Sequence, residues 1–163
     1  MTDDRNEDER VKRFWDAYAA SARVGPAEYI VVRFGDGAKL ADELAAQVVA
    51  GKKRATTSLL RDLTESSKPM PKPGDHVVVV DGKNSPRCIV RILNVNIKPL
   101  CEVDEGFASD EGGGDRSLEW WRSAYARYFS RQGAREGFAV DDATVVILER
   151  FEVVWPNELA CMR

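Results

Sequence analysis

The segment with the clearest chemical potential is residues 51–58, which brings three cationic and three hydroxyl side chains together within eight residues. The glycine at its start allows the backbone to turn and to approach a ligand closely. Lysine and arginine donate hydrogen bonds to phosphate or carbonyl oxygens. The segment therefore carries the residue types of an anion or nucleotide site, and those of a catalytic one.

Lys53 and Thr56 are the candidate catalytic pair, because they are three residues apart and can share a pocket. A lysine held in a cleft has a lowered pKa, since desolvation disfavours the charged form. A neutral amine can then act as a base toward a neighbouring hydroxyl. In an extended segment Lys52 and Lys53 point to opposite sides, so only one of them can face inward with Thr56. The alternative is a solvated basic turn, the usual fate of a run of charges.

Residues 102–115 form an acidic and glycine-rich segment whose function the sequence leaves open. Their spacing does not match a calcium-binding loop. They could supply one carboxylate that faces the lysine across a cleft, a divalent cation site, a mobile lid, or a solvated acidic loop. Besides Glu102, five acidic side chains crowd within twelve residues: Asp104, Glu105, Asp110, Glu111 and Asp115.

Other side chains with chemical potential are scattered along the chain. His76 is the only histidine, which excludes a two-histidine ribonuclease mechanism, and we expect it on the surface at the start of a strand. Trp120 and Trp121 lie about 100° apart on a predicted helix, so one is expected in the core and the other could offer a face to a base. Arg33 and Arg116 are candidate clamps for phosphate or carboxylate.

Composition indicates one ordinary soluble domain. The chain has 163 residues, of which 44% are hydrophobic and 31% charged, with a net charge of -3. This balance excludes a bulk cation of the histone type, so contact with nucleic acid would need a local basic patch. No apolar run could span a bilayer and no leader is evident, which predicts a cytoplasmic protein. Cys88, Cys101 and Cys161 form no CxxC pair or disulfide framework, so we expect idle thiols.

Hydrophobic periodicity predicts an α+β domain. Helices are expected over residues 7–22, 38–50 and 117–131, with residues 1–9 frayed and Gly25-Pro26 ending the first helix. Strands are expected over residues 28–34, 76–80, 87–98 and 144–155, and a loop over residues 64–74. A change of apolar phase within residues 87–98 predicts a bulge or sharp bend. Together these elements predict a curled, largely antiparallel sheet flanked by helices.

Several segments, in their order along the chain, resemble the ASCH domain family in what looks like a longer bacterial subtype. The resemblance covers residues 28–156 and implies a PUA-like fold, a small curled β-barrel flanked by helices with a cleft lined by the GxKxxT segment. Residues 1–27 would then be a helical extension and residues 157–163 a tail. The matching segments are Phe34-Gly35-Asp36, residues 41–44, Gly51-Lys52-Lys53 with Ala55-Thr56 and Ser58-Leu59, residues 73–75, 81–82 and 88–90, residues 102–108, residues 111–118, Trp121-Arg122 and residues 149–154.

The resemblance implies an association with RNA. Some short bacterial ASCH proteins are amidohydrolases that remove the acyl group from N4-acylcytidine nucleosides. They use a lysine, a threonine three residues later and a glutamate, which match Lys53, Thr56 and Glu111 here. Ribonuclease activity is attributed to the longer subtype, and in that form a divalent metal could bind at the acidic segment.

We therefore expect a hydrolase that acts either on single-stranded RNA, as a ribonuclease, or on a modified nucleoside or nucleotide, as an amidohydrolase. The sequence does not decide between these two activities. The alternatives are a non-catalytic RNA-binding module and a domain that binds small molecules or proteins. The oligomeric state stays open. The candidate substrate-binding residues are Lys52, Arg54, Thr57, Ser58, Arg33, Arg116 and Trp120.

Overall fold

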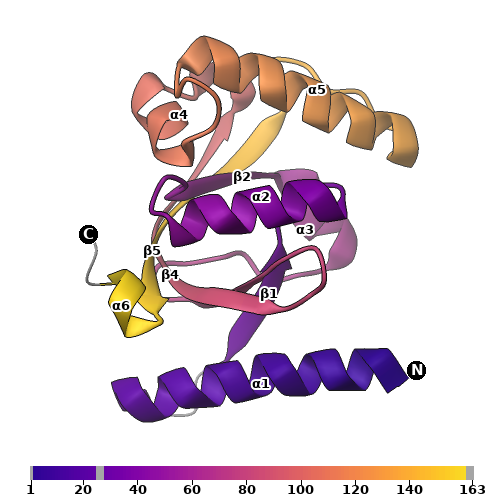
Figure 1. Ribbon diagram of the computed structural model, residues 1–163. Coiled ribbons are helices and arrows are strands. Elements are labelled where there is room, and N and C mark those ends of the chain that lie inside the picture. Colours follow the sequence, from indigo (N-terminus) through magenta and orange to yellow (C-terminus); the bar gives the residue numbers. More distant parts are fainter. Residues whose placement is uncertain (1, 25–27, 161–163) are drawn as a thin grey trace. The chain divides into compact units, whose positions relative to one another are not determined.

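The computed structural model describes residues 2–24 and 28–160 (Figure 1). The expected helix stop at Gly25-Pro26 and Cys161 lie outside these residues. The helices are α1 (Thr2–Ala22), α2 (Ala38–Val49), α3 (Leu60–Ser66), α4 (Glu105–Glu111), α5 (Leu118–Glu136) and α6 (Asn157–Ala160), with a 3-10 turn η1 (Leu100–Glu102). Among the described residues, no helix combines the length and hydropathy needed to cross a bilayer.

The strands are β1 (Tyr29–Arg33), β2 (Ala55–Leu59), β3 (His76–Val80), β4 (Pro86–Pro99) and β5 (Val145–Trp155). They form one sheet in the order β1-β3-β4-β5-β2. Strand β1 runs parallel to β3, whereas β3 with β4 and β2 with β5 are antiparallel pairs. The expected α+β class with a curled, mostly antiparallel sheet and flanking helices is confirmed.

The chain divides into two compact units. The first comprises Met1–Gly51, Pro73–Leu93 and Phe151–Arg163, and the second comprises Lys52–Lys72 and Asn94–Arg150. Strands β4 and β5 contribute residues to both units. The basic segment at residues 51–58 lies in the second unit from Lys52 onward, together with the acidic segment and α5.

In the first unit, α1 packs its apolar stripe on the sheet. Val11, Trp15 and Tyr18 are buried in one cluster with Val78 and Ile89. The helix begins at Thr2, so the expectation that residues 1–9 would fray is wrong for the described residues. Side chains of its first turns are held by hydrogen bonds, because Glu7 accepts from Asn84 and Arg10 donates to Ser85.

Helix α2 turns a narrow stripe of residues toward the core. Its buried residues are Ala41, Ala45 and Val48, whereas Leu40 and Leu44 are half-buried. Small alanine side chains allow a helix to approach its neighbour closely, which explains why they occupy the innermost positions here.

Strand β4 carries an irregularity near its start. Val79 pairs with Cys88, but Val80 pairs with Pro86, so Arg87 is the extra residue of a bulge. The change of apolar phase in the sequence indicated a bend further along the strand, after Ile92. The bulge at Arg87 lies before that point. Leu93, the residue after Ile92, is exposed.

In the second unit, α4 and α5 cover one apolar core. Its buried members are Ala55 and Leu59 of β2, Phe107 and Ala108 of α4, Trp121 and Phe129 of α5, and Val103, Val146 and Leu148. Helix α4 lies where an acidic loop was expected. Helix α5 runs five residues beyond its expected end at residue 131, until Gly137 adopts a left-handed conformation with φ 81°.

Candidate functional site

Lys53 and Glu111 form a buried ion pair in the second unit, between the segment just before β2 and the end of α4. The Lys53 side chain is 3% exposed and Glu111 is 6% exposed. Lys53 Nζ lies 3.2 Å from Glu111 Oε2 and donates a second hydrogen bond of 2.8 Å to the Ala55 carbonyl oxygen. Buried charges are costly unless they are paired and hydrogen-bonded, and both conditions hold here. The structure thus brings together Lys53 and Glu111, two of the residues singled out in the sequence.

Two hydroxyl groups complete what we call the Glu111 cluster, defined as Lys53, Thr57, Glu111 and Tyr125. Thr57 Oγ1 donates to Glu111 Oε1 at 2.5 Å, and the Tyr125 hydroxyl donates to Oε2 at 2.7 Å. Both carboxylate oxygens therefore accept hydrogen bonds from within the unit. Burial, followed by the negative charge of Glu111, holds the pKa of Tyr125 well above its ordinary value. The phenol is thus a stable donor at neutral pH.

The alternation of β2 decides which threonine joins the cluster. Ala55, Thr57 and Leu59 are buried, whereas Thr56 and Ser58 between them are only half-buried. Side chains two residues apart share a face of an extended segment, so an even spacing from Lys53 is needed. The sequence hypothesis placed Thr56 beside Lys53, but the structure gives that place to Thr57, four residues after the lysine. Thr56 turns to the other face of β2.

Helix α4 delivers Glu111 as its last residue. The Asp104 side chain caps its start by accepting from the Phe107 backbone N–H at 2.9 Å. Gly112 closes its end in a left-handed conformation with φ 78°. A Cβ built on Gly112 would lie 1.9 Å from the Lys52 carbonyl oxygen, so only glycine allows this backbone contact. The contact brings the end of α4 against the segment that carries Lys53.

Asp110 links the C-terminal end of α4 to the segment before β2 and to β5. Its carbonyl oxygen accepts from the Arg54 backbone N–H at 2.7 Å. Its carboxylate accepts from Arg54 Nη2 at 3.2 Å and from Arg150 Nε at 2.8 Å. Arg54, an expected substrate-binding residue, is therefore engaged in an internal ion pair.

The arrangement of strands and helices has counterparts among known proteins. The family model for the ASCH domain matches residues 30–155 of the chain. The chain belongs to the ASCH domain family. No curated protein matches it.

Two solved structures share the fold of this ASCH domain. The crystal structure of an ASCH domain from Lactobacillus crispatus JV V101 is 31% identical with a TM-score of 0.82, and the match covers 90% of this chain and 94% of that one. A protein from Enterococcus faecalis V583 is 28% identical with a TM-score of 0.81, over 90% and 88% of the two chains. These likenesses confirm the expected PUA-like fold.

Other residues that the sequence proposed for binding in this ASCH domain lie around the end of α4 and in the first unit. The Arg116 guanidinium donates to the Lys52 carbonyl oxygen at 3.4 Å, and both side chains are exposed. Trp120 is 39% exposed while Trp121 is buried, so one tryptophan packs in the core as expected. Arg33 is exposed on β1. This strand belongs to the first unit, whereas the Glu111 cluster belongs to the second.

His76 lies in the first unit and has a structural partner there. It is half-buried, and the Tyr18 hydroxyl lies 3.0 Å from its Nε2 atom. Burial is the main cause that lowers its pKa; Arg91 lowers it further and Asp75 opposes this. The expectation of a surface histidine is therefore only partly met.

Four acidic side chains of residues 102–115 make hydrogen bonds or ion pairs within the protein. Asp104 caps α4, Asp110 binds two arginines and Glu111 binds Lys53. Asp115 accepts from the Ser117 backbone N–H, and its hydrogen bonds with Ser117 lower its pKa. Within residues 2–24 and 28–160, no three His, Cys, Asp or Glu side chains are grouped so as to hold a metal ion.

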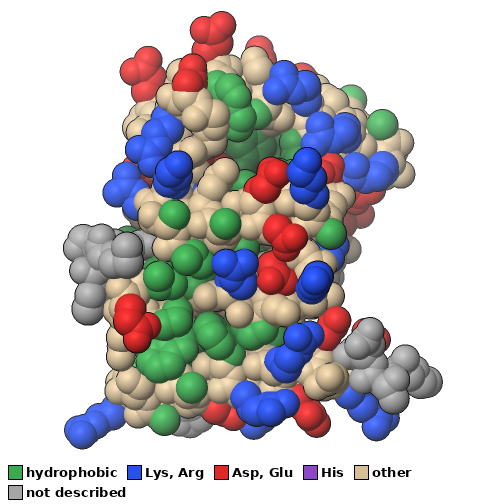
Figure 2. Space-filling view, in the orientation of Figure 1, with side chains coloured by type: hydrophobic (Ala, Val, Ile, Leu, Met, Phe, Trp, Pro, Cys, Tyr) green, Lys and Arg blue, Asp and Glu red, His purple; other side chains and the backbone are tan. Residues whose placement is uncertain are grey.

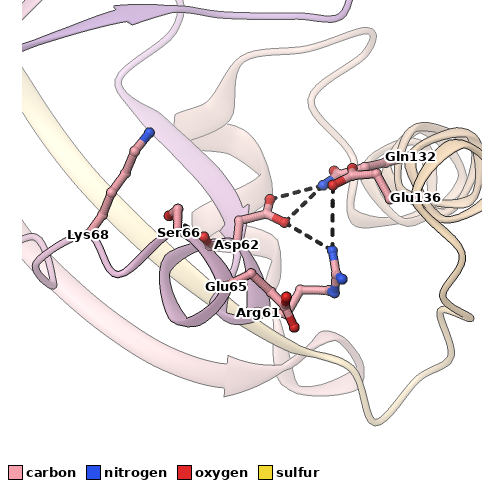
Figure 3. A pocket seen from close by; sticks show the side chains of 7 residues that line it. All are labelled: Arg61, Asp62, Glu65, Ser66, Lys68, Gln132 and Glu136. Atoms are coloured by element: carbon pink, nitrogen blue, oxygen red, sulfur yellow. Dashed lines mark hydrogen bonds and ion pairs between the residues drawn. The ribbon is translucent and has the colours of Figure 1, made fainter.

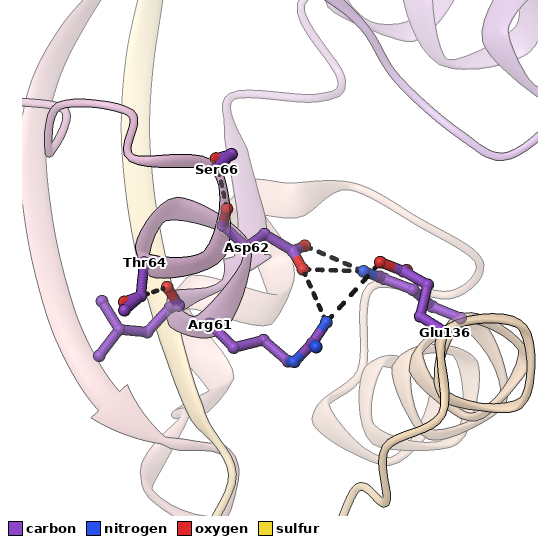
Figure 4. A network of polar contacts seen from close by, with 7 residues as sticks. Arg61, Asp62, Thr64, Ser66 and Glu136 are labelled. Atoms are coloured by element: carbon purple, nitrogen blue, oxygen red, sulfur yellow. Dashed lines mark hydrogen bonds and ion pairs between the residues drawn. The ribbon is translucent and has the colours of Figure 1, made fainter.

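Two open hollows of this ASCH domain lie away from the Glu111 cluster. The larger, of about 650 Å³, is lined by residues of α3 and α5 and by Lys68 (Figure 3). There Gln132 Nε2 donates to both carboxylate oxygens of Asp62. Arg61 Nη1 lies 3.4 Å from Asp62 Oδ1 and 3.7 Å from Glu136 Oε1 (Figure 4). Neither hollow includes a residue of the cluster. The expected cleft beside residues 51–58 therefore stays a prediction.

Tyr125 is the member of the cluster that the sequence did not reveal. Its ring packs against Trp121 at a centroid distance of 4.7 Å, as expected for an aromatic residue on the apolar face of a helix. A buried tyrosine hydroxyl, however, needs a hydrogen-bond partner. That requirement was the available signal that Tyr125 would reach a polar group.

Proposed function

We propose that this ASCH domain hydrolyses an amide on a modified nucleoside, with the Glu111 cluster as its reaction centre. The observation that supports this most is the buried Lys53–Glu111 pair with a threonine hydroxyl on the same carboxylate. A buried ion pair is weak as a source of stability, and an apolar pair of similar volume often serves as well. Buried charged groups that each have a specific charged partner often occur at functional sites.

The cluster supplies each role that amide cleavage needs. Glu111 accepts the Thr57 hydroxyl proton while Thr57 Oγ1 attacks the acyl carbon. The Lys53 ammonium stabilises the negative charge that develops on the acyl oxygen. Glu111 then returns the proton to the departing base amine, which leaves an acyl ester on Thr57. A water then loses a proton to Glu111 and attacks that ester. Glu111 passes the proton to Thr57 Oγ1 as the acid leaves, which restores both side chains.

Access to the cluster requires a local rearrangement. Thr57 is 8% exposed and its hydroxyl is committed to Glu111. The turn at residues 112–114, which follows Glu111, consists of three glycines and carries no side chains. We assign the opening to this turn, which would have to move together with the Trp120 side chain that packs against Gly113 and Gly114.

Surface charge suits a small substrate better than a long RNA. The net charge is -3, and on the face drawn in Figure 2 acidic and basic side chains are interspersed with apolar ones. Arg54 and Arg150 donate to Asp110. Tight binding to a polyanion requires many cations that can neutralise phosphates, and here several are already paired.

A non-catalytic RNA-binding module is the second candidate. It is favoured by the complete internal pairing of the Glu111 carboxylate and by the exposure of Lys52, Arg116 and Trp120. In such a module the cluster would be a structural element, and the exposed side chains would contact phosphates and bases.

The decisive experiment is to incubate the protein with N4-acetylcytidine and to follow the release of cytidine and acetate. Substituting Thr57→Val or Glu111→Gln should lower kcat/KM by about 10²- to 10⁴-fold, the usual contribution of a positioned acid or base. Thr56→Val is the matched control and should stay within about threefold of wild type. Circular dichroism of each variant checks that it is folded.

The same proteins incubated with a labelled single-stranded RNA separate the other possibilities. Cleavage of the RNA chain without release of acetate would support the ribonuclease form. Salt-dependent binding with neither reaction would support the binding module. Equal loss of acetate release in the Thr56 and Thr57 variants would contradict the role given to Thr57.

A further inference from the structure

The Trp120 indole lies flat against the backbone of two glycines. A Cβ built on Gly114 would lie 2.2, 2.3 and 2.4 Å from three atoms of its fused rings, and one on Gly113 would lie 2.3 Å from its six-membered ring. Such nearly equal distances place Gly114 over one face of the indole. Because the side chain is still 39% exposed, its solvent contact comes from the opposite face and the edges.

Hydrogen bonds hold this arrangement in place. The Gly113 carbonyl oxygen accepts from the Arg116 backbone N–H at 2.9 Å, and Arg116 has a φ of 66°. The Ser117 hydroxyl accepts from the Trp120 backbone N–H at 3.0 Å. A side chain fixed before its ligand arrives loses little conformational entropy on binding.

The glycine turn against which the indole packs also adjoins the Glu111 cluster. Gly112 directly follows Glu111 and touches the Lys52 carbonyl oxygen, to which the Arg116 guanidinium also donates. The exposed charges on this part of the chain are mixed, since Asp115 and Glu119 are exposed as well. Mixed charge suits an uncharged flat ligand better than a chain of phosphates.

We propose that the exposed face of Trp120 is a stacking platform for the base of a nucleoside. This inference rests on the proposed function, because it supplies the base-binding part of the substrate site. Every nucleobase has a π-face, so the platform tolerates different bases and leaves discrimination of the acyl group to the Glu111 cluster.

Calorimetric titration with N4-acetylcytidine tests the platform. Trp120→Ala should weaken binding about 5- to 150-fold, as loss of base stacking usually does. Trp120→Phe keeps an aromatic face and should stay within about threefold of wild type, whereas Trp120→Leu keeps only apolar bulk and should bind as weakly as the alanine variant. Equal affinity of the leucine and phenylalanine variants overturns the proposal.

A second variant tests the glycine seat without removing the indole. Gly113→Ala should displace Trp120 and weaken binding by a similar factor, while thermal unfolding confirms that the protein is folded. If a folded Gly113→Ala protein binds with wild-type affinity, contact with the glycine backbone does not position the indole, and the platform proposal is overturned.

The platform and the proposed hydrolysis can fail separately. Binding is therefore also measured in the Glu111→Gln variant, in which hydrolysis should be slow, and adding Trp120→Leu should weaken binding there too. Hydrolysis by Trp120→Leu with an unchanged KM overturns the platform while the proposed function stands. Binding that depends on Trp120 in a protein with no hydrolysis supports the platform alone. Binding of a single-stranded oligonucleotide through Trp120 without binding of the nucleoside overturns the nucleoside assignment.

Discussion

Gly112 and Lys52 meet backbone to backbone, because a Cβ on Gly112 would lie 1.9 Å from the Lys52 carbonyl oxygen. Glu111 precedes the first of these residues and Lys53 follows the second. The contact therefore brings together the two segments that carry the buried ion pair. Any side chain at position 112 must push them apart.

Gly112→Ala should destabilise the protein by about 2–4 kcal/mol, the sum of a strained positive φ and a steric clash. Gly137→Ala is a matched control, because Gly137 also ends a helix with a positive φ of 81°, but a Cβ placed there would meet no atom within 4 Å. It should cost only about 1–2 kcal/mol. Urea unfolding of both variants measures the difference, and equal losses would show that the contact with Lys52 is unimportant.

The Lys53–Glu111 pair should show strong energetic coupling. Lys53→Met alone leaves a buried carboxylate without its counter-ion and should cost about 3–5 kcal/mol. The double substitution with Glu111→Met should cost less than the sum of the single ones by about 2 kcal/mol or more. A double-mutant cycle by chemical denaturation measures this coupling. The exposed Lys12–Asp16 pair is the control, and its coupling should not exceed about 0.5 kcal/mol.

Thr57 and Thr56 should differ in stability as well as in activity. Thr57→Val removes a donor to the buried Glu111 carboxylate and should cost about 1–3 kcal/mol. Thr56→Val lies on the other face of β2 and should change stability by less than about 0.5 kcal/mol. Thermal unfolding compares them, and similar losses from both substitutions would contradict the assignment of faces.

Tyr125 should remain protonated beyond the ordinary range of tyrosine. Because its pKa is raised in the folded state, its contribution to stability is complete below the ordinary value of 10.0 and is lost as the pH rises through the folded value. Tyr125→Phe should remove a late component from the tyrosinate absorbance titration and cost about 0.5–1.5 kcal/mol for the lost hydrogen bond. A titration in which the variant loses an early component instead would rule out the buried phenol.

His76 should make stability depend on pH in the acidic range. Its pKa is lowered in the folded state, so its contribution is present above the ordinary value of 6.5 and is lost as the pH falls from there through the folded value. Urea midpoints measured between about pH 5 and pH 8 should therefore fall more steeply for wild type than for His76→Gln. Parallel pH profiles for the two proteins would contradict this role.

Periodicity and family resemblance could predict the fold and two members of the cluster, Lys53 and Glu111. They could not assign the faces of β2. Residues 55–59 read Ala-Thr-Thr-Ser-Leu, so hydroxyl side chains fall on both faces and polarity does not reveal the inward one. The three-residue spacing implied by the resemblance therefore pointed to Thr56, where the fold places Thr57.

Helix α4 was hidden for a different reason. It has seven residues, too few for a helical period to be recognised, and three of them are acidic. What stabilises it is the Asp104 cap, the left-handed Gly112 and the burial of Phe107 in the core. Capping and tertiary packing, rather than intrinsic propensity, determine such short helices.

The caps at the two ends of α4, Asp104 and Gly112, also limit which insertions and deletions this segment tolerates. One residue inserted between Asp104 and Gly112 would rotate the last side chain by about 100° and remove the carboxylate from Lys53. Substitutions inside the helix leave that angle intact. Homologous chains that keep the buried pair should thus preserve the interval between the two caps more strictly than the residues that fill it.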